Sequence, residues 1–468
     1  MLAVALKNKP LWILLLVLFF LATWSPTGTF VEFPKYWHDE AFAMEQARTF
    51  LELGRLDFIV APNTPSGMAI ALSANGPPLS IPLAGVFYLF GIGLLQARVY
   101  MLFWLIAVTI AVYLFLKKTF DTPSAVAGTL LMATFASFYA NGRTATGDIP
   151  GLFFCVIALY FFVHKRQYAW SGIFFALAAV TKTSAFHMAL PAAGIVLLFF
   201  EKKLFFLPAI RFGTGALLVI LMWFLILLPY PYSLSDLTPL IEFYQNPTHK
   251  ASLLEQFSGG IPSLLFSSTI GYFGILALIV FVAFFKSRRT MSDAQKRVYV
   301  FVATYAVLQA IVFLRSPGWI RYLVALEIFI LMLLFPALSA LAPSKKISYA
   351  LVGFLAGFQF AHYLSFSNIL PRADITPHVA ALNQLLDEHT GSTIGFIDNL
   401  MTSAFIPSSK KFNYIHFGGS TAGAHPFTLP QEEWPDFMDS IGPEYAHIQE
   451  YFYEPFYLSD GEIVFRKK

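Results

Sequence analysis

Ionisable side chains stand beside apolar segments at several points of this 468-residue sequence. The acidic pair Asp39–Glu40 follows the first apolar segment, and Asp148 directly precedes a later one. Lys182 ends another apolar segment, and the pair Arg321–Tyr322 begins one more. A carboxylate can take a proton from a hydroxyl group as a general base, and cations can neutralise a departing phosphate. These residue types therefore suit the transfer of a group that is activated by a phosphate.

Each of these residues also has a simpler explanation. Asp39 can cap the helix that follows it, and Asp148 can complement the dipole of its own helix. Arg143 and Asp148 are close enough in sequence to form a surface ion pair, and Lys182 can extend its amine to the membrane surface. Taken singly, none of them identifies a site; they do so only if the fold brings them together.

Asp39 and Glu40 are neighbours on a predicted helix, and successive helical residues point about 100° apart. Only one of the two carboxylates can therefore face a given site. We expect Asp39 to be the leading catalytic carboxylate, with Glu40 in a supporting role and Asp148 as the second acid of the site.

The composition is that of an integral membrane protein. Hydrophobic residues make up 57% of the chain and charged residues only 12%, with a mean hydropathy of +0.65, whereas soluble domains carry about 25% charged residues. Apolar segments of membrane-spanning length recur, so we predict a mainly α polytopic membrane protein with about eleven transmembrane helices. These are Leu11–Trp24, Val99–Leu116, Ser124–Tyr139, Ile149–Val163, Tyr168–Thr181, Phe186–Phe200, Phe212–Tyr230, Leu264–Phe285, Val298–Leu314, Tyr322–Leu341 and Ile347–Phe366. The only cysteine, Cys155, excludes an intramolecular disulfide.

The positions of Lys and Arg predict the orientation, because short loops rich in these residues face the cytoplasm. Such clusters recur at 117–118, 165–166, 202–211, 286–297 and 345–346. With these connections inside, the N-terminus is cytoplasmic, and Asp39, Asp148, Lys182 and Arg321 all lie at the outer face of the cell membrane. We interpret the first apolar segment as a retained span; a cleaved signal peptide is the alternative.

This orientation requires that Leu79–Gly93 does not cross the membrane. We expect it to be a helix in the outer interface that begins at Pro77–Pro78. A second interfacial helix is predicted over Glu40–Leu53, followed by Gly54 at its C-terminal end. One face of that helix is polar and comprises Glu45, Arg48, Thr49 and Glu52. Both helices belong to a structured first outer loop, residues 25–98.

The composition changes after Ser367, where polar residues become common and acids outnumber bases. We therefore divide the chain into a transmembrane domain, residues 1–367, and a small extracytoplasmic α/β domain, residues 368–468. Pro377–Thr390 has apolar residues at helical spacing, while Thr393–Ile397 and Glu462–Phe465 are typical of short strands.

The predicted orientation gathers the carboxylates of Asp39 and Asp148 and several cations at the outer face. The candidate groups for binding a donor phosphate are Lys182, Arg321, Arg315, Arg143 and the Tyr322 hydroxyl. No nucleotide pool exists outside the membrane, so an enzyme there must draw its activated group from a lipid. A polyprenyl phosphate would be such a donor.

In this order the motifs resemble those of the GT-C membrane glycosyltransferases. The most similar branch is the family-39-like group, which includes dolichyl-phosphate-mannose protein mannosyltransferases and bacterial transferases that move aminoarabinose to lipid A. The motifs are His38–Asp39–Glu40, Pro77–Pro78–Leu79, Arg143 with Asp148, Thr181–Lys182 and Arg321–Tyr322. The resemblance is best from Trp37 to about Leu190. Leu56–Gly76 departs from the pattern, which leaves the acceptor side of the site unassigned.

The resemblance implies an inverting transfer of a sugar from a polyprenyl phosphate. Asp39 matches the first-loop aspartate that acts as base or site organiser, Glu40 its acidic neighbour and Asp148 the second-loop acid. Lys182 and the pair Arg321–Tyr322 match positions that hold the donor phosphate. Some members bind a divalent metal such as Mg, Mn or Zn near these acids; Asp39 and Asp148 permit one here but do not require it.

A lipid or solute transporter, or flippase, is the alternative function. It would line a path through the middle of the membrane with polar residues and broken helices. The ionisable residues here gather instead at the outer ends of the predicted spans, which favours the enzyme. A third alternative is a scaffold without activity, for which Asp39 would be dispensable. The acceptor can be a lipid, a glycan or a protein, and nothing in the sequence suggests nucleic acid as a partner.

Overall fold

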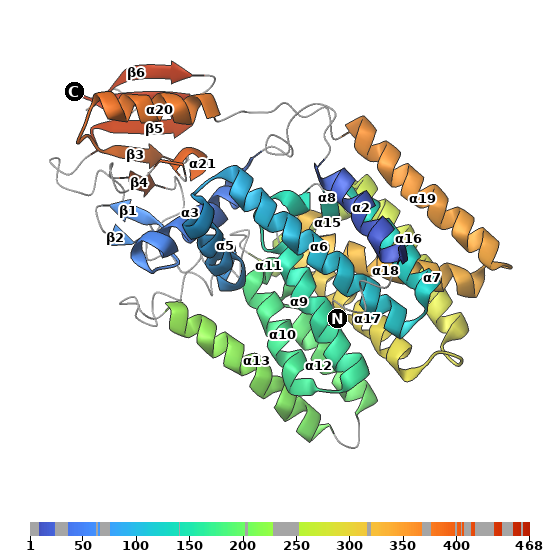
Figure 1. Cartoon of the computed structure of the whole chain (residues 1–468). Helices are drawn as coiled ribbons and strands as arrows, with labels where there is room; N and C mark the ends of the chain where they lie inside the picture. The colour runs from blue at the N-terminus through green and yellow to red at the C-terminus, as the bar shows by residue number, and fades with distance from the viewer. Residues whose placement is uncertain are drawn as a thin grey trace.

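A computed structural model describes most of the chain as a helix bundle with a small sheet beside it (Figure 1). The described residues are 9–23, 36–61, 64–65, 75–139, 141–201, 205–227, 252–315, 320–366, 376–397, 400–403, 405–406, 413–416, 435–441, 453–459 and 462–468. All statements below concern these residues.

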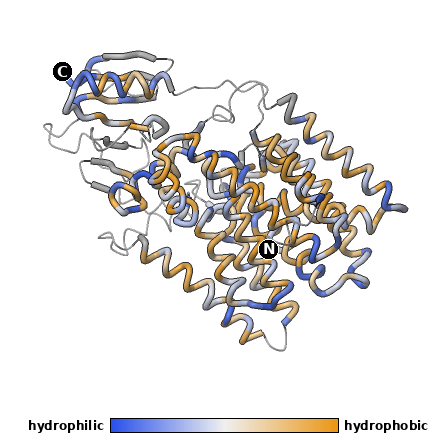
Figure 2. The backbone as a smooth tube through the Cα atoms, viewed as in Figure 1, coloured by the Kyte–Doolittle hydropathy of each residue, from blue (hydrophilic) through white to orange (hydrophobic). Residues whose placement is uncertain are grey.

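The bundle consists of helices of unequal length. They are α2 (Lys9–Thr23), α6 (Leu94–Thr119), α7 (Thr122–Thr134), α8 (Ala136–Tyr139), η1 (Asn141–Arg143), α9 (Asp148–Tyr160), η2 (Phe161–Lys165), α10 (Tyr168–Thr181), α11 (Thr183–Phe186), α12 (Ala189–Phe200), α13 (Phe206–Leu227), α15 (Leu253–Phe266), α16 (Ser268–Ser287), α17 (Asp293–Arg315), η4 (Ile320–Leu323), α18 (Val324–Leu341) and α19 (Lys345–Phe366). Figure 2 shows that they are mostly hydrophobic along their lengths. This is expected of helices that meet lipid as well as each other.

Within the described part of the chain, seven helical segments are long and apolar enough to cross a membrane. They are Leu94–Thr119, Asp148–Lys165, Thr183–Phe200, Phe206–Leu225, Ser268–Ser287, Asp293–Arg315 and Ile320–Leu341. The multi-pass membrane architecture is therefore confirmed. Of the other predicted spans, α2 and α10 are apolar but shorter, and Ser124–Tyr139 is interrupted at Phe135, between α7 and α8. The number eleven stays a prediction.

The first loop contains the two predicted helices. Helix α5 (Pro77–Phe90) has 14 residues and begins with proline, and Gly91 follows its end. At 1.5 Å per residue it is about 21 Å long, too short to cross about 30 Å of hydrocarbon. Helix α3 (His38–Leu53) ends at Gly54, whose φ of 68° is the left-handed conformation that glycine adopts readily. Strands β1 (Ile59–Ala61) and β2 (Thr64–Pro65) pair after it.

The polar face of α3 is largely buried, whereas a helix that lies in the membrane interface would present such a face to water. Glu45, Arg48 and Thr49 are fully buried, and Glu52 is exposed. The reason is that α21 (Leu400–Ser403) packs against this face of α3. An amphipathic pattern shows that one face of a helix needs polar partners. It does not indicate whether those partners are water or another part of the same protein.

The C-terminal unit is a five-stranded sheet with the order β4-β3-β5-β7-β6. The strands are β3 (Ile394–Ile397), β4 (Asn413–His416), β5 (Phe437–Ile441), β6 (Tyr453–Ser459) and β7 (Glu462–Lys467). β3 pairs in parallel with β4 and β5, and β7 pairs antiparallel with β5 and β6. Helix α20 (Thr376–Glu388) packs on the sheet through Leu382 and Leu386. The predicted helix and two strands thus lie in this unit, whereas the predicted boundary at residue 368 falls outside the described residues.

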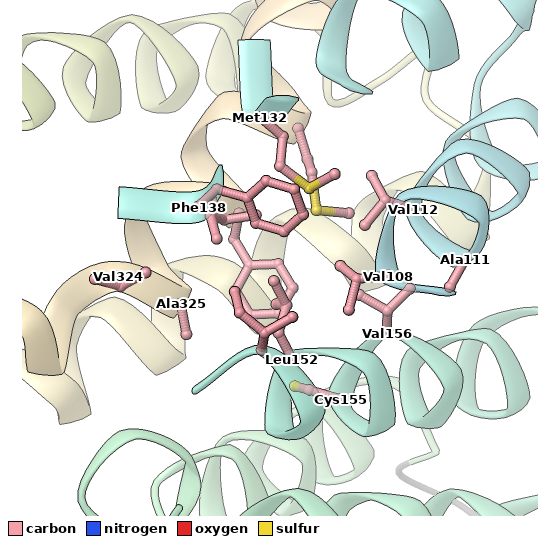
Figure 3. Packing of buried hydrophobic residues seen from close by; sticks show 14 of the residues in the cluster. Val108, Ala111, Val112, Met132, Phe138, Leu152, Cys155, Val156, Val324 and Ala325 are labelled. Carbon is pink, nitrogen blue, oxygen red and sulfur yellow. The ribbon is translucent and has the colours of Figure 1, made fainter. Parts of the chain in front are cut away.

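Buried apolar side chains fill the middle of the bundle. Figure 3 shows residues of α6, α9 and α18 converging there, together with Met132 of α7 and Phe138 of α8. Cys155 points into the same core and is a free, buried thiol. Because this centre is packed with apolar atoms, the ionisable residues that matter for chemistry lie at the helix ends.

Candidate functional site

Asp39 lies in the first turn of α3 and does not cap it. The N-cap position is taken by Trp37, whose carbonyl accepts hydrogen bonds from the N–H groups of Glu40 and Ala41, both at 3.1 Å. The capping explanation for Asp39 is therefore wrong. Its carboxylate is free to project from the helix, where the positive end of the helix dipole favours a negative charge.

The carboxylate of Asp39 is held between two cations from distant parts of the chain. Its Oδ2 atom lies 2.7 Å from Nη1 of Arg321 and 3.4 Å from Nζ of Lys182. The side chains of Lys182, Asp39 and Arg321 are 3%, 16% and 27% exposed, so the group is largely shielded but open on the Arg321 side. Both cations aim at one oxygen atom.

Lys182 occupies the break between α10 and α11. Its backbone is extended, with φ −146° and ψ 90°, so it ends one helix and begins the next. The nearly complete burial of its side chain contradicts the idea that its amine extends to the membrane surface. A buried ammonium group requires a counter-charge, and Asp39 supplies it.

Arg321 is positioned by aromatic rings. It belongs to the short 3-10 helix η4, and its guanidinium carbon lies 4.8 Å from the centre of the Trp37 ring and 5.6 Å from that of Tyr322. A cation over an aromatic face is attracted by the negative charge density of the ring. Gln309 of α17 donates hydrogen bonds to the carbonyls of Tyr322 (3.0 Å) and Ser184 (3.1 Å), which ties η4 to α11.

Asp148 is the first residue of α9 and is half-buried. It lies within electrostatic range of Tyr322, as do Asp39 and Arg321. Among the described residues Asp148 has no hydrogen-bond or ion-pair partner. The predicted surface pair with Arg143 is therefore wrong, and the Asp148 carboxylate is available to a ligand.

Glu40 faces away from this group, as its position next to Asp39 predicted. It is fully buried, with its oxygens 3.3 Å from Nε and 3.0 Å from Nη2 of Arg98, and it accepts the N–H of Ala145 at 3.1 Å. The pair joins α3 to α6 and to the loop before α9. These contacts suit the supporting role expected of Glu40, and a catalytic role for it stays a prediction.

Two other predicted phosphate-binding residues lie elsewhere. Arg143 is fully buried and donates to the carbonyl of Ala22, one of the last carbonyls of α2, which have no partner inside their own helix. This contact joins Arg143 to α2, and its binding of a donor phosphate stays a prediction. Arg315 ends α17 and is half-buried; it is not among the residues that contact Asp39.

Several contributors were not foreseen as part of the site. Arg98, Asn75 and Gln309 all hold its backbone or its charges in place. Arg98 could have been found, because an arginine at the edge of an apolar span requires a buried partner. Asn75 has no comparable signal, since a neutral residue in an irregular segment belongs to no periodic pattern.

A metal ion at this site would have two carboxylates as ligands, those of Asp39 and Asp148. The described residues contain no group of three or more His, Cys, Asp or Glu side chains suited to hold an ion. Asp39 already pairs with two cations. A divalent ion would have to compete with both for the same oxygen, so the arrangement permits a metal without favouring one.

Comparisons with known proteins agree with the predicted fold. Residues 76–228 match the family model described as dolichyl-phosphate-mannose-protein mannosyltransferase, a range that includes Asp148 and Lys182. No match to a curated protein sequence was found.

Solved structures of similar fold cover nearly the whole chain. An oligosaccharyltransferase of Archaeoglobus fulgidus, crystallised with Zn and sulfate, has a TM-score of 0.61 at 13% identity, covering 98% of this chain and 73% of that one. ArnT from Cupriavidus metallidurans bound to undecaprenyl phosphate has a TM-score of 0.60 at 12% identity, with 97% of each chain covered. The A. fulgidus oligosaccharyltransferase AglB, in complex with an inhibitory peptide and a dolichol-phosphate, has a TM-score of 0.57 at 12% identity, covering 98% of this chain and 74% of that one. The chain therefore has the same fold as these ArnT and oligosaccharyltransferase structures, as the predicted resemblance implied.

Proposed function

We propose that the protein is an inverting glycosyltransferase that moves a sugar from a polyprenyl phosphate to an acceptor at the outer face of the cell membrane. The observation that carries this proposal is the convergence of Lys182 and Arg321 on one oxygen of Asp39. Two cations that can grip one carboxylate oxygen can equally grip one oxygen of a phosphate. ArnT, which has the same fold, was solved with undecaprenyl phosphate, and this supports the choice of donor.

In the proposed reaction an acceptor hydroxyl attacks C1 of the sugar. The bond between C1 and the phosphate oxygen breaks, and its electron pair leaves with the polyprenyl phosphate. Lys182 and Arg321 neutralise the charge that develops on this phosphate. A carboxylate of the site takes the proton of the attacking hydroxyl. A single displacement from the opposite side inverts the configuration at C1.

We choose Asp39 as the base because a bound donor phosphate would compete with it for Lys182 and Arg321. Without a ligand its Oδ2 atom holds both cations. When a donor phosphate draws Lys182 and Arg321 toward itself, Asp39 is released to accept a proton. The base thus becomes available only when a donor is bound. Asp148, whose carboxylate has no partner among the described residues, is the second acid and the alternative base.

The positions of the charges favour an enzyme over a transporter. Asp39 lies at the start of α3, Lys182 at the end of α10 and Arg321 in the turn before α18. A transporter would need its polar groups halfway along the helices, where the apolar core lies in this protein. Placement of the site outside the membrane follows from the Lys and Arg clusters of the sequence and forms part of the proposal.

The proposal is tested with the purified full chain in nanodiscs. The protein is incubated with a panel of radiolabelled polyprenyl-phosphate hexoses and pentoses and with extracted lipids, glycans and proteins of the envelope as acceptors. Release of polyprenyl phosphate and label in the acceptor fraction are measured. We expect transfer with at least one donor and a loss of at least a hundredfold in Asp39→Asn.

Asp121→Asn is the matched control. Asp121 caps α7 through the N–H of Ser124, an interaction that asparagine can also make. Equal transfer by Asp39→Asn and the wild-type protein would refute the assignment of the base. If no donor of the panel binds or reacts, the enzyme proposal itself is wrong.

A further inference from the structure

One side chain connects the two acidic residues of the site. Asn75, which is fully buried, donates from Nδ2 to the backbone carbonyl of Asp39 at 3.1 Å. Its Oδ1 accepts the backbone N–H of Gly147, the residue before Asp148, at 2.8 Å. A single planar amide therefore spans from α3 to the start of α9.

The orientation of this amide follows from its partners. A backbone carbonyl can only accept a hydrogen bond, and a backbone N–H can only donate one. The nitrogen of the Asn75 side chain must therefore face Asp39 and its oxygen must face Gly147. Asparagine suits this position because it offers a donor and an acceptor side by side without a charge. Aspartate would offer only acceptors when ionised, and leucine would offer neither.

The neighbour of Asn75 makes the third connection. The N–H of Gly76 donates to the carbonyl of Thr181, the residue before Lys182, at 3.1 Å. A Cβ atom at Gly76 would lie 1.7 Å from the carbonyl oxygen of Val180, and one at Gly147 would lie 2.3 Å from that of Thr181. Gly76 and Gly147 thus lie directly against the backbone that leads to Lys182, and a side chain at either position would clash with it.

We infer that Asn75 is a positioning residue that sets the separation of the Asp39 and Asp148 carboxylates and their register with Lys182. It is not a catalytic residue, because both of its polar groups are engaged by backbone and its side chain is shielded from any substrate. This inference rests on the proposed function. It gives Asn75, in the segment before α5, an indirect role in catalysis. This role is not evident from the sequence, because Asn75 is far along the chain from both acids.

The inference predicts a specific kinetic defect. A displacement of about 1 Å between reacting groups can cost about a hundredfold in rate. In Asn75→Ala the donor phosphate should still bind Lys182 and Arg321, so KM for the polyprenyl-phosphate sugar should change less than threefold. The value of kcat should fall by about a hundredfold, because the base and the second acid are no longer held together.

The pH dependence of kcat in Asn75→Asp distinguishes a positioning role from a general loss of stability. Ionised, the new carboxylate keeps the bond from Gly147 but repels the carbonyl of Asp39. Protonated, its hydroxyl can donate to that carbonyl and restore the original pattern. The ratio of variant to wild-type kcat should therefore rise at least tenfold between pH 8 and pH 5.5, whereas the ratio for Asn75→Ala should stay flat.

Gln46→Ala is the matched control. Gln46 is also a fully buried amide between α3 and α5, where it accepts a hydrogen bond from Ser80 at 3.0 Å. This variant loosens the contact between α3 and α5, whereas Asn75 links α3 to the start of α9. Transfer, binding of undecaprenyl phosphate and thermal unfolding are measured for all four proteins.

The outcomes separate the inference from the function on which it rests. A loss of kcat in Asn75→Ala that Gln46→Ala does not share, with acid recovery of Asn75→Asp, supports the inference. Equal kcat in Asn75→Ala and the wild-type protein overturns it while leaving the transferase intact. A pH-independent ratio for Asn75→Asp also overturns it. If the wild-type protein transfers no sugar, the proposed function fails first.

Discussion

Arg48 and Ser403 are 355 residues apart in sequence, yet the guanidinium of Arg48 donates to the carbonyl of Ser403 at 2.7 Å. The same guanidinium donates to the carbonyl of Ile406 at 2.6 Å and pairs with Glu45 at 2.5 Å. The C-terminal unit is thereby fastened to α3, the helix whose first turn carries Asp39. Figure 1 shows the sheet and α21 next to this helix.

Replacing Arg48 should release the C-terminal unit. In Arg48→Met the buried carboxylate of Glu45 loses its partner, which typically costs about 3–5 kcal/mol. We expect limited proteolysis to cleave the variant near residue 400 at least tenfold faster than the wild-type protein. Arg466→Met is the control, since Arg466 pairs with Glu454 at an exposed position inside the sheet. Equal cleavage of both variants would show that Arg48 does not fasten the unit.

The same junction should weaken as the pH rises. Burial raises the pKa of Glu45 above its ordinary value of 4.5, although Arg48 opposes the shift. An acid whose pKa is higher in the folded state favours folding below its unfolded pKa, and this contribution is lost as the pH rises through the folded pKa. Thermal unfolding of the junction should thus occur at higher temperature near pH 4 than near pH 8. Glu45→Gln should remove most of that difference, and an unchanged dependence would contradict the assignment.

Arg321 should not be replaceable by lysine. Its guanidinium carbon lies 4.8 Å from the centre of the Trp37 ring while its Nη1 atom reaches Asp39, and lysine cannot make both contacts because its charge is a compact point. We expect Arg321→Lys to weaken binding of undecaprenyl phosphate about tenfold and Trp37→Leu about three- to tenfold, as the loss of about 1 kcal/mol implies. Microscale thermophoresis measures both. Trp170→Leu is the control, because Trp170 is 53% exposed and lies near the start of α10, at the opposite end from Lys182. The affinity of this variant for undecaprenyl phosphate should not change.

Disruption of the Glu40–Arg98 pair should lower the stability of the protein. Glu40→Gln keeps an acceptor for the N–H of Ala145 but removes the charge that faces Arg98. Loss of one partner of a buried pair costs about 3–5 kcal/mol. The double variant Glu40→Gln/Arg98→Met should recover part of that loss. Thermal unfolding of the two single variants and the double variant checks this; strictly additive effects would show that the pair is not coupled.

Transfer should persist in the presence of EDTA. A divalent ion at Asp39 would displace Lys182 and Arg321, the groups that we assign to the donor phosphate. We therefore expect less than a twofold change in rate after treatment with EDTA and readdition of Mg, Mn or Zn. Loss of activity with EDTA and its recovery with one of these ions would assign Asp39 and Asp148 to that ion.

The sequence predicted the convergence of Asp39, Lys182 and Arg321 because charges at the ends of apolar spans can lie on only two faces of a membrane. It also predicted α5 and α3, since proline at one end and glycine at the other are local signals. The contact of Arg143 with the carbonyl of Ala22 could not be predicted, because a charge near a span end can serve a ligand or cap another helix. The partners of Asn75 and Arg48 depend on contacts between distant segments, which no local pattern encodes.

The contacts of α3 with residues near position 400 also have a consequence for folding during synthesis. When Arg48 has emerged from the ribosome, its two carbonyl partners have not yet been synthesised, and the intervening spans must insert first. The helix that carries Asp39 can reach its final setting only after Ser403 and Ile406 have followed. A truncated nascent chain would therefore insert into the membrane with its acidic residue present but not yet set for reaction.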